Sequence, residues 1–153
     1  MELFNVFDNE DWEYEYERPG RSFKDTPIGP RLGAELLGAS LYEVAPGLGF
    51  WPYHFHHSNE ELLIVLAGTP TLRAPDGERT LEPGDCVLFP RGPEGAHTLR
   101  NDSDEPARFL IFSTLLSPEI ITYPDSGKIG ARSEWTRGNF VEESAVDYWE
   151  GED

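Results

Sequence analysis

The sequence predicts an all-β protein, a sandwich or a barrel, folded as a single domain. From Leu36 to Thr114, short apolar or alternating runs are separated by turn residues that recur every six to twelve positions. Many short strands at such spacing are typical of antiparallel sandwiches and barrels. No stretch of this region keeps a helical period over three turns, so a helical core is not expected. With 153 residues, of which 38% are hydrophobic, the chain is long enough for one core.

The first element, residues 1–30, is acidic and aromatic and contains the turn pair Pro19-Gly20. This composition predicts an N-terminal arm that lies over the domain. Aromatic residues in it alternate with glutamates, which indicates a half-buried strand packed on the outside: Trp12, Tyr14 and Tyr16.

The second element, residues 31–123, is the predicted barrel. Its expected strands are LLGASLYEVA, WPYHFH, ELLIVLA, TLRA, RTLE, CVLFP, AHTLRN and ARFLIFST. Asp76-Gly77 predicts a two-residue type I′ turn, which needs positive φ at both positions. ELLIVLA is apolar on both faces, so the arm, the tail or a second subunit should cover its outer face. Cys86 lies in the apolar run CVLFP and is expected to be a small buried residue.

The third element, residues 124–153, is a C-terminal loop and tail. One more strand is expected in EIITYPDSGKIG, which spans its start, followed by a loop containing glycine and arginine. The tail should pack on the barrel or across a subunit boundary because it carries several large apolar residues: Phe140, Val141, Val146, Tyr148 and Trp149.

The charge and the hydropathy pattern limit the binding partners and the cellular location that we expect. Twenty-nine acidic residues against twelve basic ones give a formal charge of -17. Such a field repels nucleic acid and anionic lipid, so neither is expected as a partner. The N-terminus shows no secretion signal and no apolar stretch is long enough to span a bilayer, so we expect a cytoplasmic protein.

The four histidines lie in two short segments about forty residues apart. His54 and His56 are two apart in a predicted strand, so their side chains share one face, while His57 points away. A turn at residues 58–59 would bring Glu61 opposite that face, and two imidazoles with a carboxylate form a metal site lacking one ligand. His97 is the remaining histidine and the candidate for that position.

The donor set indicates the class of metal. Three imidazoles and one carboxylate suit a divalent transition metal, namely Mn, Fe, Co, Ni, Cu or Zn, and disfavour Ca or Mg. A metal that takes six ligands would keep two positions for water, substrate or dioxygen, as catalysis requires.

With these two histidine-containing segments the sequence resembles the cupin superfamily, whose two signature segments it carries in order. The first is His54-Phe-His56, four residues, Glu61, six residues and Gly68; the second is Gly84, five residues, Pro90-Arg-Gly92, then His97 and Asn101. The resemblance covers residues 36–115. It implies a single-domain double-stranded β-helix, or jelly-roll, with a His54, His56, Glu61 and His97 metal centre, and it favours a homodimer. The sequence departs from the family pattern at Leu48, where a glycine is common, and in the four residues between Gly92 and His97, where two are commoner.

Strand parity also predicts the surroundings of the centre. The interior should be apolar and suited to an organic molecule, with these residues on its walls: Phe50, Pro52, Leu63, Val65, Leu99, Asn101 and either Phe109 or Phe112. Asn101 is expected to satisfy backbone groups of the turn that follows it. The possible anion clamps, Arg73, Arg91 and Arg100, are expected at the surface, so a phosphorylated substrate is not favoured.

Two classes of function remain open on the sequence. The first is a metal-dependent enzyme that acts on a small organic molecule, either an oxygenase or an isomerase or lyase. The alternative is a non-catalytic cupin that binds or senses a small, for example sugar-like, molecule. A vestigial storage barrel is disfavoured because every ligand position is filled, and the fold does not choose between the other two.

Overall fold

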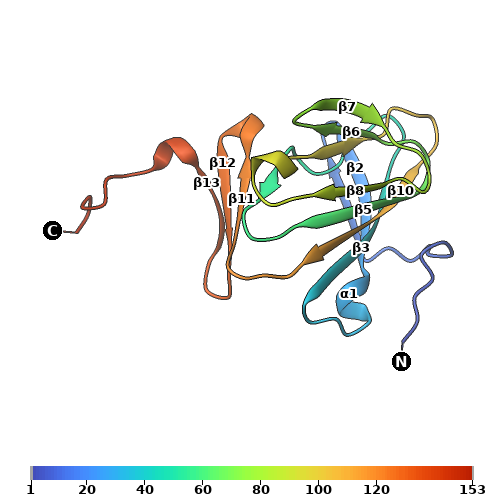
Figure 1. Ribbon diagram of the computed structural model, residues 1–153, viewed down its shortest axis with the longest axis horizontal. Helices are drawn as coiled ribbons and strands as arrows, with labels where there is room; N and C mark the ends of the chain where they lie inside the picture. The colour runs from blue at the N-terminus through green and yellow to red at the C-terminus, as the bar shows by residue number, and fades with distance from the viewer. Residues whose placement is uncertain (1, 153) are drawn as a thin grey trace.

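The computed structural model describes residues 2–152, and antiparallel strands build almost all of it (Figure 1). The strands are β1 (Tyr14–Arg18), β2 (Arg21–Pro27), β3 (Leu37–Val44), β4 (Phe55–His56), β5 (Glu61–Ala67), β6 (Thr71–Ala74), β7 (Gly77–Thr80), β8 (Cys86–Phe89), β9 (Thr98–Arg100), β10 (Ala107–Thr114), β11 (Glu119–Tyr123), β12 (Lys128–Arg132) and β13 (Arg137–Val141). The short helices are α1 (Ile28–Arg31), η1 (Pro93–Gly95), η2 (Pro124–Ser126) and η3 (Glu142–Ser144).

The strands form three antiparallel sheets that wrap around one core. The largest has the order β1-β2-β3-β10-β5-β8, the second the order β13-β12-β11-β4, and the third the order β7-β6-β9. Isolated bridges join Gly49 to Arg100 and His54 to His97, which tie the loop before β4 to the segment around β9. This arrangement confirms the expected all-β jelly-roll.

The alternation of side chains along β5 separates an inner from an outer face. Leu63 and Val65 are fully buried inside, whereas Leu62 is exposed outside. The inner face joins the main core, which consists of Phe23, Val44, Phe50, Leu63, Val65, Leu72, Leu81, Phe89, Leu99, Phe109 and Ile111. A second cluster lies on the outer face of β3 and β10, where Phe4, Val6 and Trp12 of the N-terminal segment pack against Leu41 and Leu110. The N-terminal segment thus supplies part of the outer cover that the sequence called for.

The N-terminal residues also contribute strands. Gly20, at φ 73°, makes the tight connection between β1 and β2, and β2 pairs with β3 from Phe23↔Val44 to Pro27↔Ser40. Only a residue without a Cβ adopts such a φ at little cost. Residues 14–27 are therefore an extension of the six-stranded sheet, and Phe23 reaches the main core.

Two local predictions are wrong. The β6–β7 turn consists of Pro75 and Asp76, because Ala74 pairs directly with Gly77, and Gly77 at φ 122° is the first residue of β7. Asp76 does not have positive φ, so the turn is not type I′; proline at the second turn position favours ordinary turns instead. Cys86 is exposed, because β8 is an edge strand and alternate residues face outward.

The C-terminal region contains more strand than the sequence predicted. β11 and β12 pair from Glu119↔Arg132 to Tyr123↔Lys128, and β13 adds to β12 where a loop was expected. The chain after β13 then runs away from the barrel (Figure 1). Tyr148 is 81% exposed and Trp149 72%, so the tail does not pack on its own barrel. The other position predicted for it, across a subunit boundary, stays a prediction.

All helices of residues 2–152 are short, and none has the length and apolar character needed to cross a membrane.

Candidate metal centre

A backbone bridge places two of the four histidines side by side. The amide of His54 donates to the carbonyl of His97 at 3.1 Å, and the amide of His97 donates back at 2.9 Å. Their ring centroids are 4.8 Å apart. Nδ1 of His54 lies 2.7 Å from the carbonyl oxygen of Pro52, and Nδ1 of His97 lies 2.9 Å from that of Gly95. A ring whose Nδ1–H is held by a carbonyl keeps the lone pair on Nε2 for a metal.

The other two predicted ligands complete the cluster. His56 ends β4 and Glu61 begins β5, so the turn between them brings both side chains to the same point. Oε2 of Glu61 lies 3.4 Å from Nε2 of His56 and 3.2 Å from Nε2 of His97. Ligand atoms of His54, His56 and Glu61 all lie within 4.8 Å of one another. The structure thus brings together His54, His56, Glu61 and His97, which we term the histidine–glutamate cluster.

His57 is directed elsewhere, as its parity predicted. Its Nε2 lies 2.9 Å from the hydroxyl oxygen of Thr122 on β11. The side chain is therefore occupied outside the cluster.

The cluster contains buried polar atoms with unused bonding capacity. Oε2 of Glu61 and Nε2 of His97 are buried and make no hydrogen bond within residues 2–152. Buried polar atoms are rarely left without a partner, and each such case calls for an explanation. Imidazole nitrogens converging on a carboxylate oxygen are the donors that divalent transition metals prefer, so these residues fit such an ion.

The protonation states suit the same role. Burial first, and then the neighbouring His97 and His56, lower the pKa of His54 to about 4 against the opposing effect of Glu61. Burial alone would raise the pKa of Glu61, but the adjacent His97 and His56 outweigh it and hold that pKa below its ordinary value. At neutral pH, His54 is a neutral imidazole and Glu61 a carboxylate, the forms that coordinate metals.

The loop before His97 explains the extra residues of the second signature segment. They form the short helix η1, and the carbonyl of Gly95 at its end is the one that meets Nδ1 of His97. A Cβ on Gly95 would lie 1.7 Å from the carbonyl oxygen of Pro90, so no larger residue fits there. The family departure in this loop therefore leaves the position of His97 intact.

A cavity of about 250 Å³ opens onto the cluster. Besides the four cluster residues it is lined by Tyr42, Phe50, Trp51, Pro52, Ile111 and Tyr123. Phe50 and Pro52 were predicted, whereas Leu63, Val65, Leu99 and Phe109 lie in the core and Phe112 on the outer face. Tyr42 and Tyr123 were missed, because β3 and β11 carry no ligand and nothing in their sequences marks them.

The two tyrosines differ in their surroundings. Burial, with the negative charge of Asp25 adding to it, raises the pKa of Tyr42 above its ordinary value. Its hydroxyl therefore stays protonated at neutral pH and can donate a hydrogen bond. The ring of Tyr123 stacks against His54, with centroids 5.9 Å apart.

Asn101 has the structural role that the sequence predicted. Its Nδ2 donates to the carbonyls of Val44 at 3.1 Å and Glu105 at 2.7 Å, and its Oδ1 accepts from the amide of Ser103 at 3.1 Å. The side chain is fully buried. It therefore holds the turn after β9 and lies away from the cavity.

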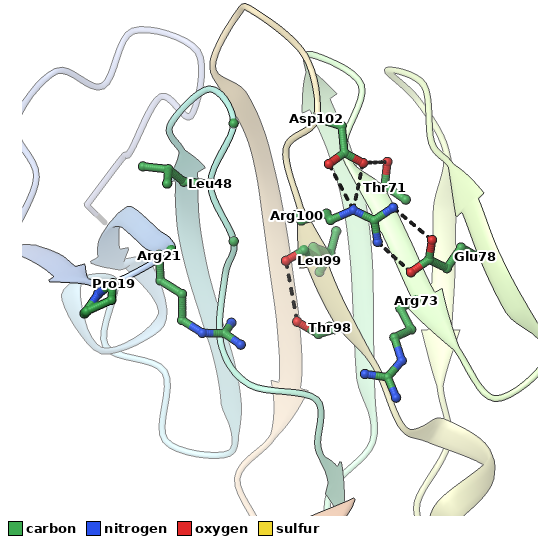
Figure 2. A pocket seen from close by; sticks show the side chains of 13 residues that line it. Pro19, Arg21, Leu48, Thr71, Arg73, Glu78, Thr98, Leu99, Arg100 and Asp102 are labelled. Atoms are coloured by element: carbon green, nitrogen blue, oxygen red, sulfur yellow. Dashed lines mark hydrogen bonds and ion pairs between the residues drawn. The ribbon is translucent and has the colours of Figure 1, made fainter. Parts of the chain in front are cut away.

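A larger hollow, of about 500 Å³, lies on the outside of the barrel (Figure 2). Two of its arginines are engaged by carboxylates: Arg100 binds Glu78 at 2.6 and 2.8 Å and Asp102 at 2.8 Å, and Arg73 binds Asp125 at 2.6 Å. Arg73, Arg91 and Arg100 are all at the surface, as predicted. Arg73 and Arg100 are therefore poorly placed to clamp an anion in this hollow.

Comparison with known proteins identifies the family. Residues 40–113 match the cupin domain model. These residues form a cupin domain. Among curated proteins, none matches its sequence.

Several solved structures resemble this one. A candidate sugar phosphate isomerase from Acidithiobacillus ferrooxidans is 25% identical, with a TM-score of 0.83 over 95% of both chains. A sugar phosphate isomerase of the cupin superfamily from Silicibacter pomeroyi is 27% identical, with a TM-score of 0.76 over 85% of this chain and 82% of that one. A polyketide cyclase from Streptomyces resistomycificus is 25% identical, with a TM-score of 0.62 over 78% and 83% of the two chains.

Proposed function

We propose that this cupin is a metal-dependent isomerase that acts on a small, sugar-like hydroxycarbonyl compound. The observation that carries the proposal is the histidine–glutamate cluster at the wall of a cavity that a small organic molecule can enter. The names of the two sugar phosphate isomerases support the reaction class. Of the two reaction classes left open by the sequence, oxygenase and isomerase or lyase, we therefore propose the second.

The residues that line the cavity have different roles in the proposed reaction. In this proposal His54, His56, Glu61 and His97 hold one divalent transition metal ion, which when bound would polarise a substrate oxygen as a Lewis acid. Tyr42 donates a hydrogen bond to a second substrate oxygen from its protonated hydroxyl. The aromatic walls around them exclude water, which strengthens each of these polar contacts.

The charge of the cavity favours a neutral substrate. Within the described chain, no arginine or lysine belongs to the cavity lining. Phosphate is normally held by arginine forks, lysine or backbone amides at a helix N-terminus. We therefore expect an unphosphorylated sugar to be used at least as well as its phosphate ester, in contrast to the names of the structural neighbours.

The test is proton exchange in deuterated water. Metal-free protein is loaded in turn with Mn, Fe, Co, Ni, Cu and Zn and incubated with aldose and ketose sugars, and NMR follows deuterium incorporation next to the carbonyl. The proposal expects exchange that depends on metal and is absent in His56→Ala. Oxygen uptake on adding the organic compound would instead identify an oxygenase, and saturable sugar binding without exchange would identify a binding protein.

We further propose that the protein is a homodimer in the cytoplasm and that the tail crosses the subunit boundary. The exposed tail aromatics and the exposed Leu62 and Leu88 on the outer face of the barrel support an additional partner surface. Truncation after Glu142 should convert a dimer into a monomer in light scattering coupled to size-exclusion chromatography. A full-length monomer, or a dimer that survives truncation unchanged, would contradict this proposal. We also propose that the chain is organised as an N-terminal arm (residues 1–30), a barrel (residues 31–123) and a C-terminal loop and tail (residues 124–153).

A further inference from the structure

One ring of the histidine–glutamate cluster is held differently from the two others described above. Nδ1 of His54 and of His97 each face a backbone carbonyl within hydrogen-bond distance. Nδ1 of His56 is buried and forms no hydrogen bond within residues 2–152. The group that it faces is a carboxylate, Oε2 of Glu119 at 3.8 Å.

Glu119 is buried at the start of β11, and most of its bonding capacity is used by the turn between His56 and Glu61. Its Oε1 accepts the amide protons of His57 at 3.0 Å and Ser58 at 3.1 Å, and its Oε2 accepts a proton from Nδ2 of Asn59. An ionised carboxylate can accept about four hydrogen bonds. Three are made, and the fourth position is on the oxygen that faces His56.

The burial of the Glu119 carboxylate also supports His56 as its partner. No lysine or arginine of the described chain forms an ion pair with it, although its side chain is only 9% exposed. A buried carboxylate requires hydrogen-bond donors or a positive partner. The ring of His56 is the remaining group that can supply a donor, and it becomes electropositive when its other nitrogen binds a cation.

We propose that Glu119 is the positioning residue of His56: its Oε2 accepts the Nδ1 proton of His56 and so presents the Nε2 lone pair to the cluster. The 3.8 Å separation would have to shorten by less than ~1 Å to reach a normal hydrogen bond. A ligating histidine commonly donates its second N–H to a carboxylate, and loss of that partner typically weakens metal binding about 10–100-fold. The inference rests on the proposed metal site.

Glu119 also ties that site to β11, the strand that supplies Tyr123 to the cavity. An alternative role for Glu119 is purely structural: it would only hold the turn between His56 and Glu61. In that case its contact with His56 is incidental and the backbone bonds of Oε1 are its whole role. In Glu119→Gln the amide oxygen can stay on the backbone amides while the N–H group faces His56. The same change removes the bond from Asn59, so the histidine backgrounds of the second experiment below are needed to separate the two roles.

The first experiment observes the metal-free protein and needs no bound ion. Long-range ¹⁵N–¹H NMR at pH 8 distinguishes the two neutral tautomers of an imidazole. The proposal expects the Nδ1–H tautomer for His56 in the wild type and a shift toward Nε2–H in Glu119→Gln. The Nε2–H tautomer in the wild type would overturn the proposal, even if Glu119→Gln failed to fold. If no metal bound at all, this measurement would still judge Glu119 separately from the proposed function.

The second experiment measures Zn²⁺ affinity by competition with a chelating dye. Glu119→Gln should bind about 10–100-fold more weakly, whereas Glu60→Gln, which loses the same charge in the same turn, should match the wild type. In a His56→Ala background Glu119→Gln should cause no further loss, but in a His54→Ala background the loss should persist. An affinity within twofold of wild type, or an equal loss in both backgrounds, would overturn the proposal in favour of the turn-shaping role.

Discussion

Asp25 allows a sharp test of the electrostatics of the barrel. It lies in β2 between Tyr14 and Tyr42, is 7% exposed, and its Oδ1 has no hydrogen-bond partner within the described residues. Burial, only partly offset by an interaction with Ser40 and reinforced by the charge of Glu13, raises its pKa from 3.8 to about 6. A raised pKa means that the folded protein binds the proton more tightly than the unfolded chain does. Asp25 therefore does not destabilise the fold well below pH 4; its destabilisation grows as the pH rises from about 4 to about 6 and is complete above that.

The magnitude follows from the shift. About two pKa units correspond to about 3 kcal/mol at most, and we expect about 1–2 kcal/mol of this because the surrounding structure relaxes around a buried charge. Asp25→Asn, which has the same shape without the charge, should raise the free energy of unfolding by that amount at pH 7.5 and by only about a third of it at pH 4.5. Urea unfolding followed by tryptophan fluorescence measures both values.

The control for this prediction is Asp104→Asn, which removes the same charge from an exposed loop position. It should change the free energy of unfolding by less than ~0.5 kcal/mol at either pH. A gain for Asp25→Asn that is equal at the two pH values, or a loss at pH 7.5, would refute the reasoning.

Three further predictions concern the cavity and its supports. His56→Ala should reduce bound metal from about one ion per chain to less than ~0.2 in mass spectrometric metal analysis, because the cluster loses one of its few donors; His57→Ala should keep the wild-type content, and full retention by His56→Ala would exclude the proposed ligand set. Tyr42→Phe should lower kcat about tenfold or more at unchanged metal content, since only the hydrogen-bond donor is lost; an unchanged rate would show that Tyr42 does not touch the substrate. Asn101→Ala should destabilise the fold by about 1–3 kcal/mol in urea unfolding, because the carbonyl of Val44 loses this donor and the carbonyl of Glu105 keeps only the hydroxyl of Ser103. A loss below ~1 kcal/mol would mean that water replaces the amide.

Much of the candidate site could be predicted because its information is local. Parity along a strand places His54 and His56 together, and the short turn to Glu61 leaves that residue few other positions. His97 is distant in the sequence and required the family pattern as well. Asn101 could be placed because asparagine before a turn satisfies nearby backbone groups.

The remaining features depend on contacts that no local pattern encodes. β2 joins the sheet because the edge of β3 is free to pair, which is a property of the assembled barrel. β12 and β13 carry glycine and arginine, residues that favour loops in isolation, yet β12 pairs with β11 and β13 pairs with β12. The outward position of Cys86 follows from β8 lying at a sheet edge, and the approach of Glu119 to His56 follows from β11 pairing with β4. Each of these required the tertiary fold.

The reciprocal amide–carbonyl bridge between His54 and His97 has a consequence for folding. It joins two segments that are far apart along the chain, so the unfolded polypeptide pays a loop-closure entropy before the donors can meet. An ion held there would bind the native state far better than the denatured ensemble. The midpoint of thermal denaturation would then rise with the concentration of that ion, through mass action. Part of the heat stability of this barrel would therefore depend on the cations in its surroundings.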